Sequence, residues 1–291
     1  MSRILPPSDL IVNSDQRIYH LDLQPGELAD TIILVGDPAR VTKVSQHFDE
    51  IQVRRQHREI ITHTGLYKGK RLSVISTGMG PDNIDIVMNE LDALKNIDFV
   101  SAQEKSTLSS LTIIRIGTCG GLQGDLPLHA YIVGSHGLGL DNLMHYYQHT
   151  HQPDEQAILS ALAEHLKKTP ISPYLCSANT NLVKHFQPEA YAGITATCGG
   201  FYGPQGRYLR AAPKYLDLLT TLSEFSYEHL KCLNFEMETS AIYGLGQLLG
   251  HRCCSLNLMV ANRINKQFSK DYSQAMEGFI EWALERILSL D

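Results

Sequence analysis

Apolar runs of strand length alternate along this chain with stretches of helical periodicity. Short runs that are apolar on both faces predict buried strands, and they lie at residues 31–36, 71–77, 111–117, 130–135 and 255–262. Apolar residues spaced three and four apart predict amphipathic helices, here within 84–94, 238–249 and 273–290, with a further helix start at Asp37-Pro38. This alternation is typical of a mostly parallel sheet covered by helices. No linker-like or repetitive stretch interrupts it, so we expect one α/β domain.

The composition and net charge indicate which classes of partner and which cellular location to expect. The 291 residues are 43% hydrophobic, and 25 Lys and Arg against 31 Asp and Glu give a net charge of −6. Without a basic stripe, a nucleic-acid partner is not expected. No window approaches the roughly 18 apolar residues of a membrane span. The polar first residues with Pro6-Pro7 do not fit a signal peptide, and the six cysteines form no CxxC. We therefore expect a cytoplasmic protein with reduced core cysteines.

Glycines end three of the predicted strands, in the segments 35–40, 76–83 and 115–121. Any one of them alone is better explained as a simple turn. However, ligands of open α/β sheets bind at the carboxyl ends of strands, and two of these segments carry an arginine, Arg40 and Arg115. A buried arginine is costly without an anionic partner, and a bound phosphate would supply one. The fingerprints of dinucleotide binding and of the P-loop are absent, which argues against NAD and against a nucleoside-triphosphate hydrolase.

Two carboxylates, Glu236 and Glu238, flank Met237 just before a predicted helix. Because the two side chains belong to different positions of the segment, one can face a ligand while the other is structural. They are equally explained as favourable charges at the start of a helix. A carboxylate facing a ligand would suit a vicinal diol such as that of ribose, because it accepts two hydroxyl hydrogen bonds.

Residues 201–210 form a glycine-rich segment with aromatic residues beside Gln205 and Arg207. A side-chain amide offers both a donor and an acceptor, and a guanidinium adds a donor fork. Together they can read the edge of a planar heterocycle while Phe201 stacks on its face. Without context, a segment of this kind is more often a surface turn.

Four motifs, in this order and at these separations, resemble the nucleoside phosphorylase I superfamily: VGDPARV, STGMG, RIGTCGG and NFEMETSA. The resemblance extends over about residues 17–290. It implies a single-domain three-layer αβα fold with a central mixed, largely parallel twisted sheet. The implied domain spans residues 17–291 and follows an N-terminal extension, residues 1–16.

Within the superfamily, FYGPQGR and VANRIN resemble the uridine phosphorylase branch. Purine enzymes of this fold usually carry a Ser-Asp pair where this chain has Asn262-Arg263. The aspartate that serves as their general acid is therefore missing, which favours uracil over a purine as the base.

The resemblance also implies a role for each matched side chain. Phosphate would contact Gly36, Arg40, Arg115 and Thr118, with Arg58 reaching across a dimer interface to the neighbouring subunit's phosphate. Ribose would contact Met237 and Glu238, with His20 lent by a neighbour to the 5′ hydroxyl. The base would contact Phe201, Gln205, Arg207 and Arg263. Arg115, Arg207 and Glu238 are thus the expected catalytic residues, and Cys119 is assigned no role.

The implied reaction is the reversible phosphorolysis of uridine to uracil and α-ribose 1-phosphate in pyrimidine salvage. Inorganic phosphate is a co-substrate, and neither a cofactor nor a metal is expected. Some relatives bind a monovalent cation between subunits through Glu, Ile and Ser. Here Glu59 is matched, but Met79 and Asn83 occupy the other positions, which argues against the cation.

Residues shared between subunits imply a homodimer as the minimum unit, and the family resemblance suggests a hexamer built as a trimer of dimers. Three other functions stay open at this point: a purine nucleoside phosphorylase, a nucleoside hydrolase of the same fold, and a catalytically silent nucleoside-binding protein.

Overall fold

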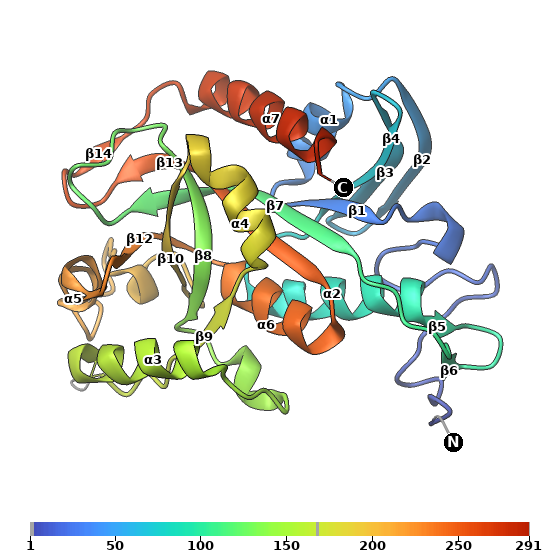
Figure 1. Cartoon of the computed structure of the whole chain (residues 1–291), viewed down its shortest axis with the longest axis horizontal. Helices are drawn as coiled ribbons and strands as arrows, with labels where there is room; N and C mark the ends of the chain where they lie inside the picture. The colour runs from blue at the N-terminus through green and yellow to red at the C-terminus, as the bar shows by residue number, and fades with distance from the viewer. Residues whose placement is uncertain (1–2, 167–168, 291) are drawn as a thin grey trace.

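The structure is a computed structural model that describes residues 3–166 and 169–290 (Figure 1). The strands are β1 (Thr31–Val35), β2 (Glu50–His57), β3 (Ile60–Tyr67), β4 (Lys70–Ser76), β5 (Ile97–Asp98), β6 (Gln103–Glu104), β7 (Thr112–Gly121), β8 (Tyr131–Gly139), β9 (Tyr174–Ser177), β10 (Tyr191–Thr197), β11 (Ser226–Tyr227), β12 (Leu230–Glu236), β13 (Arg252–Asn262) and β14 (Gln267–Phe268). The helices are α1 (Pro38–Ser45), α2 (Pro81–Asn96), α3 (Pro153–Leu166), α4 (Thr180–Phe186), α5 (Leu218–Glu224), α6 (Thr239–Leu249) and α7 (Tyr272–Leu288).

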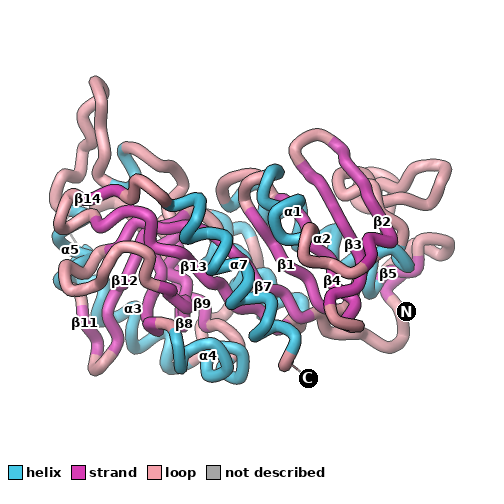
Figure 2. The backbone as a smooth tube through the Cα atoms, turned by 90° about the horizontal axis from the view of Figure 1, so that it is seen from above, coloured by secondary structure: helices cyan, strands magenta, loops and turns pink. Residues whose placement is uncertain are grey.

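The central sheet is mixed, in the strand order β11-β12-β10-β8-β13-β7-β1-β4-β3-β2. Strands β4, β1, β7 and β13 are parallel, as are β8, β10 and β12, and the two groups meet in the antiparallel pair β8 and β13. Strand β12 also pairs antiparallel with β7, which closes β7, β13, β8, β10 and β12 into a ring. Figure 2 shows β2, β3 and β4 on one side of β1, and β8 and β12 on the other. The expected mixed, largely parallel α/β sheet is confirmed.

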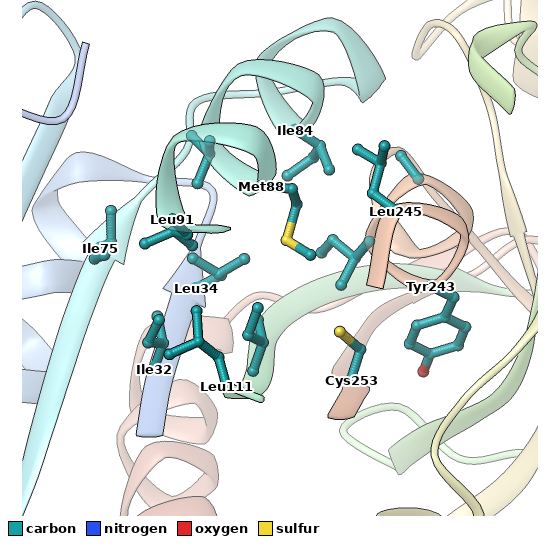
Figure 3. Packing of buried hydrophobic residues seen from close by; sticks show 14 of the residues in the cluster. Ile32, Leu34, Ile75, Ile84, Met88, Leu91, Leu111, Tyr243, Leu245 and Cys253 are labelled. Atoms are coloured by element: carbon teal, nitrogen blue, oxygen red, sulfur yellow. The ribbon is translucent and has the colours of Figure 1, made fainter. Parts of the chain in front are cut away.

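Helices cover the sheet on two faces because its strands alternate their apolar side chains. On β1, Ile32 and Leu34 join one buried cluster with residues of α2 and α6, whereas Ile33 and Val35 join the opposite cluster with residues of α1, α4 and α7. Figure 1 shows α1 and α7 above the sheet and α2 and α6 below it. Figure 3 shows the α2 side of the first cluster, where Met88 and Leu91 pack over Leu34. The expected three layers are present.

The predicted strands and helices lie where the periodicity placed them, with ends shifted by a few residues. Helix α1 begins after Asp37, whose Oδ1 accepts a hydrogen bond from the Ala39 N–H (2.9 Å) and so caps the helix. Helix α2 begins at Pro81, directly after Gly80, whose φ of 97° favours glycine. The two segments that follow β1 and β4 are therefore turns into helix amino termini, as expected.

The third glycine segment departs from the prediction. Residues 117–121 do not form a turn, because β7 continues to Gly121 and pairs there with both β12 and β13. Glycine is needed because side chains of other strands occupy the space: a Cβ on Gly121 would lie 2.0 Å from Met259 Sδ. The glycines thus admit close packing inside a strand rather than a change of direction.

The remaining expectations about the chain are simpler. All six cysteines are buried and unbridged, as predicted. Within the extension expected at residues 1–16, the Leu5 N–H donates a hydrogen bond (2.8 Å) to the carbonyl of Ala102, in the turn between β5 and β6. No helix in the described residues has the length and apolar character needed to cross a membrane.

We expect Leu34→Ala to lower the free energy of unfolding by about 3 kcal/mol, because it leaves a cavity between β1 and α2. Leu34 is fully buried, whereas Leu108, in the loop before β7, is 56% exposed. The matched control Leu108→Ala should change the stability by less than about 0.5 kcal/mol. Urea denaturation followed by circular dichroism, at one protein concentration, measures both. Equal losses in the two variants would contradict this packing.

Candidate active site

A cavity of about 710 Å³ opens where the segments after β1, β4, β10 and β12 meet β7 and β13. It gathers most of the residues that the sequence singled out: Gly36, Arg40, Arg115, Thr118, Phe201, Gln205, Arg207, Met237 and Glu238. They come from positions as far apart as 36 and 238 in the chain, and the fold brings them to one place. His20, Arg58 and Arg263 are not part of the cavity wall.

Arg115 lies at the buried end of this cavity and is 5% exposed. One of its guanidinium nitrogens, Nη2, forms an ion pair with Glu238, and Nη1 lies 3.6 Å from Glu236 Oε2. Burial acts to lower the pKa of Arg115, but the carboxylates of Glu238 and Glu236 outweigh it and raise that pKa. The arginine is therefore a fixed positive charge with its compensation alongside.

The two carboxylates of the 236–238 segment both face Arg115, but they have different roles. Glu236 accepts hydrogen bonds from the backbone N–H groups of Glu238 (2.9 Å) and Thr239, and from the Thr197 hydroxyl (2.6 Å). It therefore fixes the amino terminus of α6. Glu238 lines the cavity and accepts a hydrogen bond from the Gly80 N–H (2.8 Å). Burial raises the pKa of Glu238, and the charge of Arg115 opposes that shift.

Arg40 places a second guanidinium beside this end of the cavity. Its Nη1 donates to the carbonyl of Ile116 on β7 (3.3 Å). Burial lowers the pKa of Arg40, and the nearby charge of Arg115 lowers it further. Gly36 and Gly78 approach closely here, since a Cβ on Gly36 would lie 3.4 Å from the Gly78 carbonyl oxygen. Two guanidinium groups near each other and the start of α1 are an arrangement suited to an anion.

The opposite part of the cavity is built by the loop after β10. Gln205 is buried, and its Oε1 accepts a hydrogen bond from Arg207 Nη1, which also donates to the Phe201 carbonyl (3.1 Å). The Arg207 guanidinium lies over the Phe201 ring, 4.0 Å from its centre. Burial and the charge of Arg263 lower the pKa of Arg207 to about 10. An aromatic face and the two polar side chains thus stand together, an arrangement suited to a planar ring with oxygen acceptors.

Arg263 supports this loop from behind. Its Nη2 donates to the Gln205 carbonyl (3.1 Å), and its side chain packs against Gly120, where a Cβ would lie 3.2 Å from the Arg263 Cγ. The preceding Asn262 has no free polar atom for a ligand: Nδ2 donates to the carbonyls of Gln123 and Leu126, and Oδ1 accepts from two N–H groups of its own turn. Asn262 is thus a structural residue.

His20 and Arg58 lie together on the surface outside the cavity. The Tyr19 ring touches the His20 ring (centroids 4.7 Å apart), and the Arg58 guanidinium lies 6.0 Å from the centre of the same tyrosine ring. His20 Nδ1 lies 2.6 Å from Glu90 Oε1. A carboxylate can only accept, so this nitrogen carries the proton and Nε2 stays available.

Several cavity residues had no signal in the sequence. Phe268, on the short strand β14, lines the cavity although it is 66% exposed, and Phe235, Val260 and Ala261 reach it from β12 and β13. Apolar strand residues of this kind look the same whether they face a core or a cavity. Glu59, Met79 and Asn83, considered above for a cation, also line it.

Comparisons with known proteins show the family and agree with the fold. The sequence profile of the phosphorylase superfamily matches residues 30–290. A uridine phosphorylase of Thermococcus kodakarensis is 29% identical over 276 residues, covering 92% of this chain and 88% of the relative. A DeoD-type purine nucleoside phosphorylase of Colwellia psychrerythraea is 26% identical over 273 residues, covering 92% and 98%. The crystal structure of a Trypanosoma brucei nucleoside phosphorylase, described as showing uridine phosphorylase activity, superposes with a TM-score of 0.89 at 33% identity, over 97% of this chain and 100% of that one.

Proposed function

The chain belongs to the phosphorylase superfamily, and within it we propose that this protein is a uridine phosphorylase. The observation that carries the proposal is the pairing of two ends in one cavity: Arg40 and Arg115 at one end, and Gln205 with Arg207 beside Phe201 at the other. The uridine phosphorylase of Thermococcus kodakarensis and the activity ascribed to the Trypanosoma brucei structure support this choice. The buried, unbridged cysteines support the expected cytoplasmic location.

In the proposed reaction, a phosphate oxygen attacks C1′ of the ribose and the C1′–N1 bond breaks. The bonding pair leaves with uracil, which then takes up a proton, and the sugar keeps the phosphate as α-ribose 1-phosphate. Phosphate is itself the nucleophile, so no side chain needs to form a covalent bond. Arg40 and Arg115 would orient it, and its negative charge would offset the positive charge that grows on the sugar.

The ion pair between Arg115 and Glu238 suits this division of labour. In the structure the two side chains form an ion pair. With both substrates bound, the guanidinium would face phosphate, and the Glu238 carboxylate would accept hydrogen bonds from the ribose 2′ and 3′ hydroxyls. Met237, on the cavity wall, would pack against the sugar.

At the other end, Gln205 and Arg207 would read the base. Uracil presents a carbonyl, an N–H and a second carbonyl along one edge, which a glutamine amide and a guanidinium match. Arg207 would also stabilise the negative charge on the departing base. Asn262 supports the choice of a pyrimidine, because its amide is fully engaged with the carbonyls of Gln123 and Leu126 and with N–H groups of its own turn, and Arg263 follows it.

We propose that the minimum unit of the enzyme is a homodimer and that three dimers assemble into a hexamer. His20 and Arg58 share one surface patch outside their own cavity, and Tyr19 lies between them. A neighbouring subunit could receive both at once: Arg58 at its phosphate, and His20 Nε2 at the 5′ hydroxyl.

The first prediction from this proposed function is that cleavage of uridine requires phosphate. Arg115→Ala should reduce kcat/KM by about a hundredfold, because one charge-assisted donor to the reacting anion is lost. Release of uracil with and without phosphate measures this. Arg252→Ala, at the amino end of β13 and away from the cavity, is the matched control and should keep most of the activity. Equal cleavage in phosphate-free buffer would favour a nucleoside hydrolase instead.

The second prediction concerns the base. Cytidine presents an amino group and an unprotonated ring nitrogen on the edge that Gln205 and Arg207 read, and each unmatched buried polar group costs about 1–3 kcal/mol. Cytidine should therefore be worse than uridine by about two to four orders of magnitude in kcat/KM. Gln205→Leu should weaken uridine far more than ribose 1-phosphate. A kcat/KM for cytidine within about tenfold of that for uridine would contradict the roles assigned to Gln205 and Arg207. A higher kcat/KM for inosine than for uridine would favour a purine nucleoside phosphorylase.

The third prediction tests the shared site. Arg58→Ala and Glu238→Ala, each inactive alone, should recover about a quarter of wild-type activity when co-expressed in equal amounts, because half of the dimers are mixed and each has one intact site. The two variants purified separately and mixed without subunit exchange are the control. No recovery in dimers shown by mass spectrometry to be mixed would argue against residues lent between subunits.

A further inference from the structure

Asn257 lies directly behind the anion end of the cavity and was not singled out by the sequence. It is fully buried on β13, where it pairs in register with Gly117 of the neighbouring strand β7. Its side chain is not part of the cavity wall. It therefore does not touch a ligand in the cavity, and any effect on chemistry must pass through another residue.

That residue is Arg115. Asn257 Oδ1 accepts a hydrogen bond from Arg115 Nη1 (2.8 Å). A guanidinium can only donate, so the orientation of the amide is settled, and Nδ2 faces the other way. There it donates to Ser255 Oγ (3.2 Å), which also accepts a hydrogen bond from the Thr239 hydroxyl (2.8 Å). Ser255 thus links the amide to Thr239, the first residue of α6, the helix that follows Glu238.

Gly117 provides the space that the Arg115 guanidinium occupies. Arg115 and Gly117 are two residues apart on β7 and point to the same side of the sheet. A Cβ on Gly117 would lie 1.8 Å from Arg115 Nη1, so the side chain of Arg115 folds back over the glycine toward Asn257. The absence of a side chain at residue 117 and the amide at residue 257 together determine where the positive charge lies.

We propose that Asn257 is a positioning residue for phosphate. Its neutral amide oxygen orients the Arg115 guanidinium without adding a negative charge that would weaken the attraction between Arg115 and the phosphate. This inference rests on the proposed function, since it assumes that Arg115 binds the phosphate co-substrate. Two carboxylates, Glu236 and Glu238, already compensate Arg115. A third at residue 257 would make this end of the cavity repel a phosphate dianion, whereas an amide orients the guanidinium without that cost.

The decisive variant is Asn257→Asp, which keeps the shape and the acceptor for Arg115 but adds a negative charge. We expect its KM for phosphate to rise at least about thirtyfold, with the KM for the nucleoside within about threefold of wild type. Asn257→Ala removes the acceptor without adding charge, so its phosphate KM should rise less, about five- to tenfold. A merely structural role predicts the reverse order, with the aspartate variant close to wild type.

One further variant is a control for the added charge, and another is a second test of the position of the guanidinium. Asn234→Asp adds the same charge on β12, at a buried amide whose Oδ1 accepts from Thr195 rather than Arg115. Its phosphate KM should change by no more than about threefold, since it does not contact Arg115. Gly117→Ala should raise the phosphate KM about as much as Asn257→Ala does, because the added methyl group displaces the guanidinium of Arg115. If circular dichroism shows that Asn257→Asp does not fold, Gly117→Ala serves as the test in its place.

The outcomes separate this inference from the proposed function. If the wild-type protein shows no phosphate-dependent cleavage of any nucleoside, the proposed function fails, and the role of Asn257 fails with it. If the wild type depends on phosphate but Asn257→Asp keeps the wild-type phosphate KM, or Asn234→Asp raises it equally, the role of Asn257 alone is overturned. The test uses whichever nucleoside is cleaved, so it does not depend on the identity of the base.

Discussion

The burial of one positive charge, on Arg115, constrains much of this structure. A guanidinium that is 5% exposed inside a sheet must be compensated, because removing a charge from water costs several kcal/mol. Glu236 and Glu238 supply that compensation; Glu236 ends β12, and Glu238 follows it at the start of α6. They reach Arg115 because β12 pairs antiparallel with β7 at Gly120 and Gly121. The closure of the five strands into a ring is therefore tied to the charge at its centre.

The same closure sets the order of groups along the cavity. Strand β12 lies between β7, which carries Arg115, and β10, whose following loop carries Gln205 and Arg207. Glu238, which follows β12, therefore lies between Arg115 at one end of the cavity and Arg207 at the other. In the proposed enzyme this order corresponds to phosphate, ribose and base, the sequence of groups in the transition state. A β-sheet fixes such an order well, because neighbouring strand ends are only about 5 Å apart.

Most strands and helices, and most residues that line the cavity, could be predicted from the sequence because both depend on local patterns. Apolar runs mark the buried strands, and glycines beside arginines mark the sites at β1 and β7. Pairing between distant strands has no such local signal. The antiparallel contact of β12 with β7, and hence the strand conformation of residues 117–121, follows from tertiary packing against Met259 and β12. Asn257 was missed for the same reason, since a polar residue in an apolar strand shows no partner until the register is known.

The two ends of the cavity differ in how their charge is balanced. Arg115 is compensated by carboxylates of its own chain, whereas no carboxylate of residues 3–166 and 169–290 forms an ion pair with Arg207 or Arg263. Burial lowers the pKa of both of these arginines, and the charge of Arg263 lowers that of Arg207 further. Among the described residues, Arg263 Nη1 has no hydrogen-bond partner. Negative charge arriving at the base end would therefore be stabilised more than a neutral group. In the proposed reaction the base is neutral in the nucleoside and gains negative charge as the C1′–N1 bond breaks. An uncompensated pair of guanidinium groups there would bind the transition state better than the substrate, which is the requirement for catalysis.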